Sequence, residues 1–405
     1  MISILKNRAA GAAALAATIA LTGAAAVGAV APANATATSG SPAQVSGQGA
    51  NGPDHVFVIM MENHGYEQVI GNTADAPYIS SLAQKYNVAS NYHGVTHPSM
   101  PNYLATISGD FQGLHDDCKA GATVTCAPEE FTTSSGDTAL DAFLTPAQYQ
   151  KAATTPHMFS GRTIVDQLED SGRSWKAYME NLPSVGSQAE YAPVVNGTTV
   201  KLYAQKHNPF MYFSRINSPG NPRLQNIVPL ENNFSKDLAS GNVPNFVWIS
   251  PNQCHDMHGV SPSGAALINL PKCGYPDSGL DHGAIQLGDA YVKQQVQEIM
   301  NSTTWKTTNS SIVLAWDEND YSGSSGGPGS PVGYSTPSGP GTAVLGGGHA
   351  PMIVINSAEG PHKTTNQLSD HYTLLSTLQH LWHLGCLANT CSPTTSGTFE
   401  ELFHP

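Results

Sequence analysis

Three clusters of polar and ionisable residues follow directly after short apolar segments of this 405-residue chain. They occupy residues 62–64, 252–258 and 317–320. In open parallel sheets, ligands bind outside the carboxyl ends of the strands, where side chains from distant parts of the chain meet. We therefore expect the three clusters to share one cleft. Taken singly, an acidic turn after a strand is more often a solvated cap or the start of a helix.

The residue types in these clusters predict a divalent metal site. Carboxylates packed closely would repel one another and resist ionisation unless a cation joined them. The oxygen ligands that Ca, Mg or Mn prefers are present on Glu62, Asn63, Asp317 and Glu318. The imidazoles that zinc or iron would prefer are those of His255, His258 and His349. The sequence leaves the identity of the metal open.

Ser99 is the first candidate for a nucleophile. It lies in the segment 96–103, where we expect it at the N-cap of a helix that has Pro101 in its first turn. A hydroxyl there meets the positive end of the helix dipole and can be ionised by a coordinated metal. A serine before a helix is more often only a cap, and Thr96 is the next hydroxyl to consider.

Short apolar segments alternate with longer helical ones, which predicts an α/β fold with a mostly parallel central sheet and helices on both faces. The expected strands are 55–61, 174–178, 246–250, 312–316 and 352–355. The expected helices are 77–86, 101–107, 163–171, 284–300 and 370–384. These elements place the polar clusters at strand ends.

Two segments read as irregular. Residues 111–157 are rich in Asp, Thr, Gly and Pro, and we expect an insertion over one edge of the sheet. Residues 322–348 form a tract of Gly, Ser and Pro that cannot be a regular element. A loop of that length in a compact domain is usually functional or mobile.

The charge balance argues against a nucleic-acid partner. The chain has 17 Lys and Arg residues against 30 Asp and Glu residues, which gives a formal charge of −13. A surface that acidic would repel a phosphate backbone along its whole length. An anionic substrate would therefore need a local attraction, such as a bound metal.

The N-terminal segment 1–35 reads as a cleaved secretory signal peptide, because basic residues precede a small-residue apolar stretch and a small-x-small site follows it. A single membrane anchor is the alternative. Residues 36–53 read as a flexible leader, and 54–405 as the catalytic domain. We expect an exported protein without stable membrane insertion.

Six cysteines fit this expectation, because exported chains usually form disulfides. They fall into neighbouring pairs, and we predict the bonds Cys118–Cys126, Cys254–Cys273 and Cys386–Cys391. A zinc site is the alternative, but the chain has no CxxC pair to support it.

Several separated motifs resemble those of one known family. They are Val-Ile-Met-Met-Glu-Asn-His-Gly-Tyr, His-Pro-Ser-Met-Pro-Asn-Tyr, Thr-Ile-Val-Asp-Gln-Leu-Glu with Trp-Lys-Ala-Tyr-Met-Glu, Asn-Gln-Cys-His-Asp-Met-His and Ala-Trp-Asp-Glu-Asn-Asp. In this order they resemble the phosphoesterase family that joins secreted acid phosphatases to bacterial phospholipases C, within the alkaline phosphatase superfamily. The likeness runs from about residue 55 to 387 and implies an alkaline phosphatase-like fold.

The resemblance implies roles for individual residues. Metal binding is implied for Glu62, Asn63, Asp317 and Glu318. Ser99 is implied as the nucleophile, in contact with the metal. Asn102 falls where a polar side chain steadies the transferred phosphoryl oxygens.

The same resemblance implies a second group of ligands. His255, Asp256 and His258 resemble a cluster that holds either a second metal or the phosphate itself. His349 resembles the last histidine ligand of the superfamily. Asn252 departs from the pattern, because many members have Asp at that place, so one metal with cationic histidines is as plausible as two metals. Cationic histidines would give an acid pH optimum, since imidazole titrates near about 6.5.

The reaction implied is hydrolysis of a small phosphate ester or of a phospholipid headgroup through a phosphoserine. The motif around Ser99 is closer to the acid phosphatase branch. We therefore predict a phosphomonoesterase first, and a phospholipase C-like phosphodiesterase as the alternative. A catalytically inactive secreted binding protein is the rival from another class. A serine esterase is disfavoured, because the Gly-x-Ser-x-Gly match at 323–327 lies in the Gly-rich tract and not at a strand-to-helix turn.

Overall fold

An eight-stranded sheet forms the centre of the computed structural model. Its strands are β1 (His55–Met61), β2 (Asn87–Ala89), β4 (Trp175–Met179), β7 (Ile227–Pro229), β8 (Phe246–Ser250), β9 (Ser310–Trp316), β10 (Met352–Asn356) and β11 (Thr364–Thr365). The strand order is β11-β2-β10-β9-β1-β8-β4-β7. Only β10 runs antiparallel to its neighbours in this sheet. The predicted mostly parallel α/β class is confirmed.

The structure describes residues 52–114, 116–124, 126, 154, 156–275, 281–320, 347–392 and 397–404. These residues belong to one compact unit that spans Ala50–Pro405. The predicted signal peptide at 1–35, nearly all of the leader at 36–53, most of the insertion at 111–157 and nearly all of the tract at 322–348 lie outside the described residues.

The central strands are apolar along their whole length. β8 and β9 are buried at every position, and β1 is buried at every position except His55. Parallel strands covered on both faces read as continuous apolar runs, which is why sequence inspection located them well. The predicted strands 55–61 and 246–250 coincide with β1 and β8.

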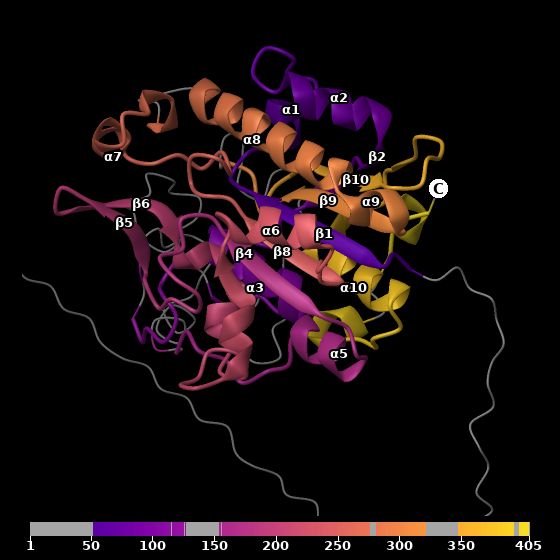
Figure 1. Ribbon diagram of the computed structural model, residues 1–405, viewed down its shortest axis with the longest axis horizontal. Helices are drawn as coiled ribbons and strands as arrows, with labels where there is room; N and C mark the ends of the chain where they lie inside the picture. The colour runs from indigo at the N-terminus through magenta and orange to yellow at the C-terminus, as the bar shows by residue number, and fades with distance from the viewer. Residues whose placement is uncertain are drawn as a thin grey trace, which may run out of the picture. The chain divides into compact units, whose positions relative to one another are not determined.

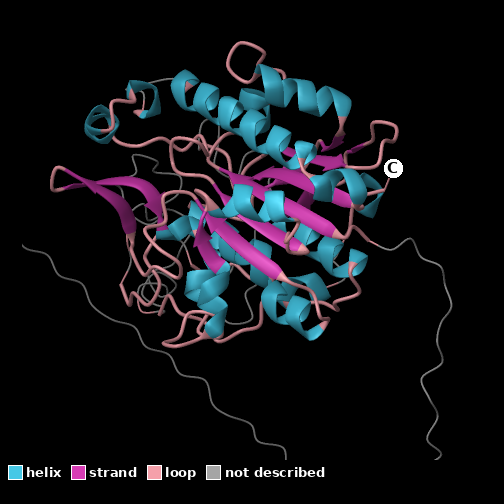
Figure 2. Cartoon of the chain, viewed as in Figure 1, coloured by secondary structure: helices cyan, strands magenta, loops and turns pink. Residues whose placement is uncertain are grey.

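Helices cover both faces of the sheet (Figure 1, Figure 2). On one face, α2 (Pro77–Lys85) packs against α8 (His282–Asn301). On the other face, α3 (Ser99–Ser108) packs against α5 (Ile164–Asp170) and α10 (His371–Leu381). One apolar cluster joins the sheet to both helical layers.

The remaining helices are short. They are α1 (Tyr66–Val69), α6 (Asn233–Ser240), α7 (Pro262–Leu267) and α9 (Thr303–Thr307). The 3₁₀ turns are η3 (Gln205–His207), η4 (Pro209–Tyr212), η5 (Pro222–Asn226), η6 (Pro271–Cys273), η7 (Ala388–Cys391) and η8 (Glu400–Leu402).

Two small sheets lie outside the central one and were not predicted. β3 (Tyr92–His93) pairs with β12 (Ser369–Asp370), and the hairpin β5 (Tyr191–Val195) to β6 (Thr198–Ala204) projects from the main body (Figure 1). Short strands and an exposed hairpin carry little apolar periodicity, so sequence patterns alone do not reveal them.

The helix that carries Ser99 begins earlier than predicted. Pro98 is the N-cap and Ser99 is the first helical residue, so the expectation of Ser99 as the N-cap is wrong. The helix ends at Gly109, whose φ of 73° places it in the left-handed region that favours glycine. A side chain at this position would also collide with the carbonyl oxygen of Leu387. The end of α3 is therefore fixed by close backbone packing.

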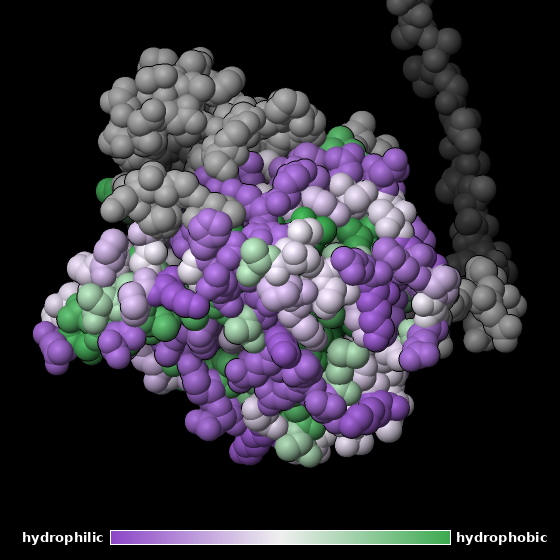
Figure 3. Space-filling model, turned by 90° about the horizontal axis from the view of Figure 1, so that it is seen from above, coloured by the Kyte–Doolittle hydropathy of each residue, from purple (hydrophilic) through white to green (hydrophobic). Residues whose placement is uncertain are grey.

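All three predicted disulfides are confirmed: Cys118–Cys126, Cys254–Cys273 and Cys386–Cys391. Among the described residues, no helix combines the length and the apolar character needed to cross a bilayer. The face of the molecule shown in Figure 3 is mostly hydrophilic, with hydrophobic side chains in small separate groups.

Candidate active site

Three carboxylates meet where β1 and β9 end. Met61 and Trp316 are paired across the two parallel strands, so Glu62 and Asp317 leave the sheet side by side. The backbone N–H of Asn63 donates to Asp317 Oδ1 at 3.1 Å, which locks the two strand ends together. Oxygens of Glu62, Asp317 and Glu318 lie within 4.8 Å of one another, and all three residues are buried. The fold thus brings together two of the clusters that the sequence singled out.

The Ser99 hydroxyl lies against this carboxylate group. Its oxygen is 2.8 Å from Glu62 Oε2 and 3.1 Å from Glu318 Oε1, and the side chain is 1% exposed. A hydroxyl has one proton to donate, so it serves one carboxylate at a time. Both are placed to accept the proton of the hydroxyl.

Burial makes the three carboxylates hard to ionise together. It raises the pKa of Glu62 to about 7. The charge of Lys206 opposes this rise, and the charge of Glu318 adds to it. Burial raises the pKa of Asp317 well above its usual value, and the charges of Glu62 and Glu318 add to this rise. Burial also raises the pKa of Glu318. A cation among them would remove this penalty.

Unpartnered oxygens show where a cation would fit. Asn63 Oδ1 and Asp317 Oδ2 are buried and make no hydrogen bond, and Glu62 Oε1 makes none either, although His207 Nε2 lies 3.2 Å from it. Buried polar atoms are otherwise almost always satisfied, so such a group calls for an ion or a ligand. Carboxylate and amide oxygens suit a hard divalent cation. The residues present therefore fit a metal of this kind.

Lys206 is the main residue that sequence inspection missed. Its ammonium donates to Ser99 Oγ at 3.1 Å and to Asp117 Oδ2 at 3.0 Å, and it lies 3.2 Å from His258 Nε2. Burial alone would lower the pKa of Lys206, but Asp117 and Glu62 outweigh it and hold the pKa above its usual value. The site therefore contains a permanent positive charge beside the serine oxygen.

Asp117 holds this lysine in place. Its second oxygen, Oδ1, accepts from the backbone N–H of Met100 in the first turn of α3, at 3.0 Å. The same residue therefore fixes both the lysine and the helix that carries Ser99. Asp117 belongs to the segment 111–157, which was read only as an insertion.

His207 bridges two carboxylates behind the lysine. Its Nε2 lies 3.2 Å from Glu62 Oε1 and its Nδ1 lies 3.2 Å from Asp256 Oδ2. The ring stacks on Tyr103, with the two planes 7° apart. Burial holds the pKa of His207 well below its usual value, and Lys206 lowers it further, so the ring is neutral. A neutral ring has one N–H to donate, so His207 lies between Asp256 and Glu62 but can donate to only one of them.

Asn102 shapes the turn before Ser99. Its Oδ1 accepts from the backbone N–H groups of Val95 and Thr96 at 2.8 and 3.1 Å. Its Nδ2 donates to the carbonyl oxygen of Thr96 at 2.7 Å and lies 3.4 Å from Glu318 Oε2. Most of the side chain's hydrogen-bonding capacity is thus engaged with the backbone.

The two histidines after β8 differ in their surroundings. His258 faces Lys206, and because an ammonium can only donate, His258 Nε2 accepts and Nδ1 carries the proton toward the carbonyl oxygen of Gly259. Burial and the charge of Lys206 lower the pKa of His258 to about 3. The positive charge at this place is therefore carried by Lys206 and not by His258. His255 instead contacts Glu180 at 2.8 Å and stacks on Tyr291.

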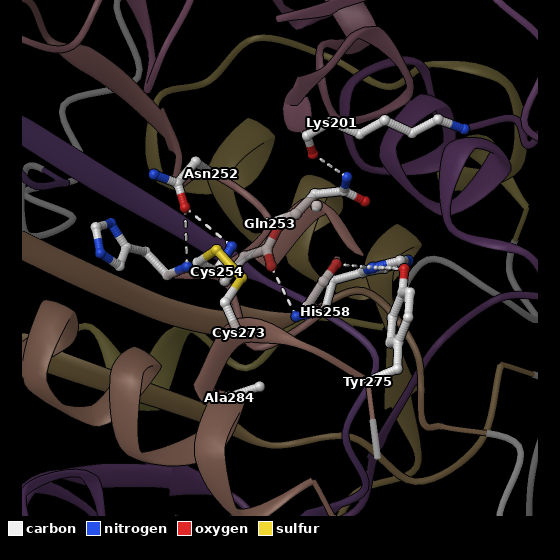
Figure 4. The surroundings of a disulfide bond; sticks show 12 residues. Lys201, Asn252, Gln253, Cys254, His258, Cys273, Tyr275 and Ala284 are labelled. Carbon is white, nitrogen blue, oxygen red and sulfur yellow. Dashed lines mark hydrogen bonds between the residues drawn. A yellow bond between two sulfur atoms is a disulfide. The ribbon is translucent and has the colours of Figure 1, made fainter. Parts of the chain in front are cut away.

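His349 and Asn252, which the family resemblance also singled out, contact residues other than the carboxylates around Ser99. His349 stacks between Tyr66 and His93, and its ring nitrogens lie 3.2 Å from Glu67 Oε1 and 3.0 Å from the carbonyl oxygen of Ser90. These contacts are not with the carboxylates around Ser99. Asn252 uses its Oδ1 to accept from the backbone N–H groups of Cys254 and His255, so it stabilises the turn (Figure 4).

A cavity of about 590 Å³ opens onto the site. Asn63, Asp117, Lys206 and His258 line it together with residues of the β5–β6 hairpin and with Tyr275. The Tyr275 hydroxyl lies 3.0 Å from His258 Nδ1, and the disulfide Cys254–Cys273 ties the two segments together (Figure 4). The cavity therefore reaches Lys206, whose ammonium contacts Ser99, whereas Ser99 itself is buried behind the lining.

Comparison with known proteins identifies a family and several similar phosphatases. A sequence model of the Phosphoesterase family matches residues 72–385. A probable acid phosphatase from Kluyveromyces lactis is 29% identical over 206 residues, which are 50% of this chain and 38% of that protein. An acid phosphatase from Aspergillus fumigatus is 28% identical over 203 residues, 50% of this chain and 36% of that protein. The chain therefore spans less than half the length of these two fungal relatives.

A phosphatidylinositol-3-phosphatase from Mycobacterium tuberculosis is 25% identical over 331 residues, 82% of this chain and 77% of that protein. A solved structure of a protein in the alkaline phosphatase superfamily from Vibrio parahaemolyticus has a TM-score of 0.45 at 13% identity, covering 84% of this chain and 70% of that one. The family match and the names of the relatives support phosphoric-ester hydrolysis as the class of reaction.

Proposed function

The chain belongs to the Phosphoesterase family, and from this premise we propose that it is a metal-dependent phosphomonoesterase that forms a phosphoserine at Ser99. The observation that carries this proposal is the position of the Ser99 oxygen. It lies within 3.1 Å of Glu62, Glu318 and Lys206, so two proton acceptors and one permanent cation converge on a single buried hydroxyl.

The metal ligands of this proposal are Glu62, Asn63, Asp317 and Glu318. The unpartnered oxygens of Glu62, Asn63 and Asp317 support it, as do the raised pKa values of the three carboxylates. A divalent cation held there would lower the pKa of the Ser99 hydroxyl and neutralise charge on the phosphoryl oxygens. The donor set fits Ca, Mg and Mn, and Zn also accepts carboxylate ligands.

The residues of the chain account for the proton and charge changes of the reaction. In the first half, Glu318 or Glu62 takes the proton of Ser99 as the Oγ–P bond forms and the ester P–O bond breaks. The leaving alcohol takes a proton from water at the open side of the cavity. In the second half, water attacks phosphorus and the P–Oγ bond breaks, and the glutamate returns its proton to Ser99 Oγ. The hydroxide left from protonation of the alcohol takes the proton of the attacking water, and phosphate leaves. Lys206 stabilises the negative charge on Oγ and on the phosphoryl oxygens throughout.

A monoester substrate is favoured over a diester. A phosphate dianion brings more negative charge than a diester, and Lys206 adds a cation to the charge of a metal. The relatives named acid phosphatase and phosphatidylinositol-3-phosphatase also point to monoesters. Release of p-nitrophenol from p-nitrophenyl phosphate, compared with p-nitrophenyl phosphorylcholine, separates the two readings. Faster turnover of the choline diester would favour the phospholipase C-like alternative.

Ser99→Ala tests the proposed nucleophile, with Thr96→Val as the matched control. We expect Ser99→Ala to lower kcat for p-nitrophenyl phosphate by at least about 1,000-fold. Wild type and Thr96→Val, quenched in acid during turnover, should each show one added phosphoryl group by mass spectrometry, and Ser99→Ala should show none. Turnover retained by Ser99→Ala but lost in Thr96→Val would move the nucleophile to Thr96. Absence of both turnover and bound metal in the wild type would support an inactive binding protein.

Export of the protein belongs to the same proposal. Three disulfides among the described residues fit an oxidising compartment. N-terminal sequencing of protein from the culture medium should show a mature chain that begins near residue 36. Recovery of only full-length protein from the cell would contradict export.

A further inference from the structure

The cavity is much larger than a phosphoryl group. Its volume of about 590 Å³ falls within the range of roughly 300 to 1,000 Å³ that is typical of sites for whole organic ligands. Lys206, Asp117 and Asn63 line the part nearest the serine. The remaining space is therefore available to the alcohol from which the phosphoryl group is removed.

The β5–β6 hairpin supplies the outer wall of this space. Tyr191, Val200 and Lys201 come from the hairpin, and Tyr275 lies on the segment that the disulfide anchors. The side chain of Gln253, next to the disulfide, donates to the carbonyl oxygen of Lys201 (Figure 4). The hairpin is thus attached to the loop that carries His258.

Lys201 is the second positive charge of the cavity. Its side chain is exposed, and its ammonium lies 4.2 Å from the centre of the Tyr191 ring, a cation–π contact that holds it at the wall. In the part of the chain that the structure describes, no carboxylate forms an ion pair with it. Lys206, by contrast, is paired with Asp117.

The local charge at the cavity contrasts with that of the whole chain. Among the lining residues, Lys201 and Lys206 are cationic and Asp117 is anionic, so the formal charges of the lining sum to +1 in a chain whose formal charge is −13. A second anion bound beside the phosphate would meet this charge.

We propose that Lys201 is a specificity-determining residue that binds an anionic group on the leaving alcohol of the substrate. The preferred substrates are then phosphomonoesters whose alcohol carries a carboxylate or a second phosphate. This inference rests on the proposed phosphomonoesterase function and adds the substrate class. Tyr191 and Tyr275 contribute flat apolar surfaces against which the carbon frame of such an alcohol packs.

Two substrates of nearly the same shape test the inference. p-Nitrophenyl phosphate and 4-carboxyphenyl phosphate differ in a neutral nitro group and an anionic carboxylate. The quantity measured is the ratio of kcat/KM for the carboxylate ester to kcat/KM for the nitro ester. Because the intrinsic reactivities of the two esters cancel when variants are compared, only a change in recognition alters the ratio.

We expect Lys201→Gln to lower this ratio about 3- to 5-fold, as for loss of one exposed ion pair. Lys201→Glu should lower it further, because it places a repulsive charge at the wall. The difference between wild type and Lys201→Glu should shrink when NaCl is raised from 0.05 to 0.5 M. Lys236→Gln in α6 makes the same change of charge at an exposed position outside the cavity lining and should leave the ratio unaltered.

Equal ratios in wild type and Lys201→Glu, with both esters hydrolysed, would overturn the inference and leave the proposed function standing. An equal fall in Lys236→Gln would also overturn it, because the effect would then come from overall charge. Failure of the wild type to hydrolyse either ester would instead overturn the proposed function, and this inference with it.

Discussion

The ammonium of Lys206 lies 3.1 Å from the hydroxyl oxygen of Ser99, and Asp117 holds it there from the other side at 3.0 Å. A buried lysine in this position supplies a fixed positive charge next to the oxygen that we propose as the nucleophile. Such a charge is most useful where negative charge develops in the transition state, because the surrounding protein excludes water. We therefore expect the lysine to take the role that we had assigned to a second metal or to a cationic histidine.

Replacing Lys206 by Met should lower kcat for p-nitrophenyl phosphate by about 100-fold or more, as for the loss of one oriented donor at the developing charge. The variant should also lose about 3 to 5 kcal/mol of unfolding free energy, because Asp117 is left as a buried, unpaired carboxylate. Steady-state kinetics and urea unfolding measure the two effects separately.

The double variant Lys206→Met with Asp117→Asn is the control for this prediction. An amide at position 117 removes the unpaired charge, so stability should recover relative to Lys206→Met alone while activity stays low. If the double variant regained activity together with stability, Lys206 would be a structural residue and not a catalytic one.

Metal removal should destabilise the protein. Glu62, Asp317 and Glu318 then face one another without a cation, and a metal at 100 times its Kd would contribute about 2.7 kcal/mol. After treatment with a chelator, we expect Tm to fall and to be restored by one of Ca, Mg, Mn or Zn added alone. Glu62→Gln should abolish the response, whereas Glu67→Gln, a 78% exposed neighbour in sequence, should retain it. Identical Tm values with and without chelator would argue against a resident metal.

The parts of the site that could be predicted lie at the ends of the central strands. Glu62 and Asp317 follow β1 and β9. Both strands are apolar along their length because both faces of a parallel sheet are covered, so they can be recognised in the sequence. Once the strands are recognised, the rule for ligand binding at their carboxyl ends places the carboxylates in one cleft. The family motifs then add Ser99.

Lys206 and Asp117 could not be found in the same way. Lys206 follows β6, which belongs to a separate hairpin, so no rule about the central sheet applies to it. Asp117 lies in a segment with irregular composition, and only tertiary contacts bring it to the lysine. The polar run 205–208 after an alternating strand was the one available signal for Lys206. For His349 the motif position did not predict its contacts, which are with Glu67 and the carbonyl oxygen of Ser90.

The disulfide Cys254–Cys273 should matter more for activity than Cys386–Cys391. It closes a segment with a sequence separation of 19, against 5 for the other bond. Chain entropy alone predicts losses of about 3 and about 2 kcal/mol when the bonds are replaced by serine pairs. The first bond also anchors His258 and Tyr275 at the cavity (Figure 4), so kcat/KM should fall only in Cys254→Ser with Cys273→Ser. Equal effects on kcat/KM in the two double variants would show that the bond does not position the cavity wall.

His157 should make the stability of the protein depend on pH. Its ring nitrogens face two acceptors, Asp116 Oδ1 at 2.7 Å and the carbonyl oxygen of Ala122 at 2.9 Å, so only the protonated ring can donate to both. Burial disfavours the charged ring, but the hydrogen bond and the charge of Asp116, together with the bond to Ala122, outweigh burial and raise the pKa of His157 above 6.5. The neighbouring Cys118 is in a disulfide, so this group is an ion pair and not a metal site.

A raised pKa in the folded state gives a stabilisation that is fully present below about pH 6.5 and is lost as the pH rises through the folded value. We therefore expect the loss of unfolding free energy in His157→Gln, measured by urea denaturation, to be larger at pH 5.5 than at pH 8.5. His362→Gln, which replaces an exposed histidine, is the control and should show no such difference between the two pH values. A loss in His157→Gln that is the same at both pH values would mean that the ring acts by packing alone, without its charge.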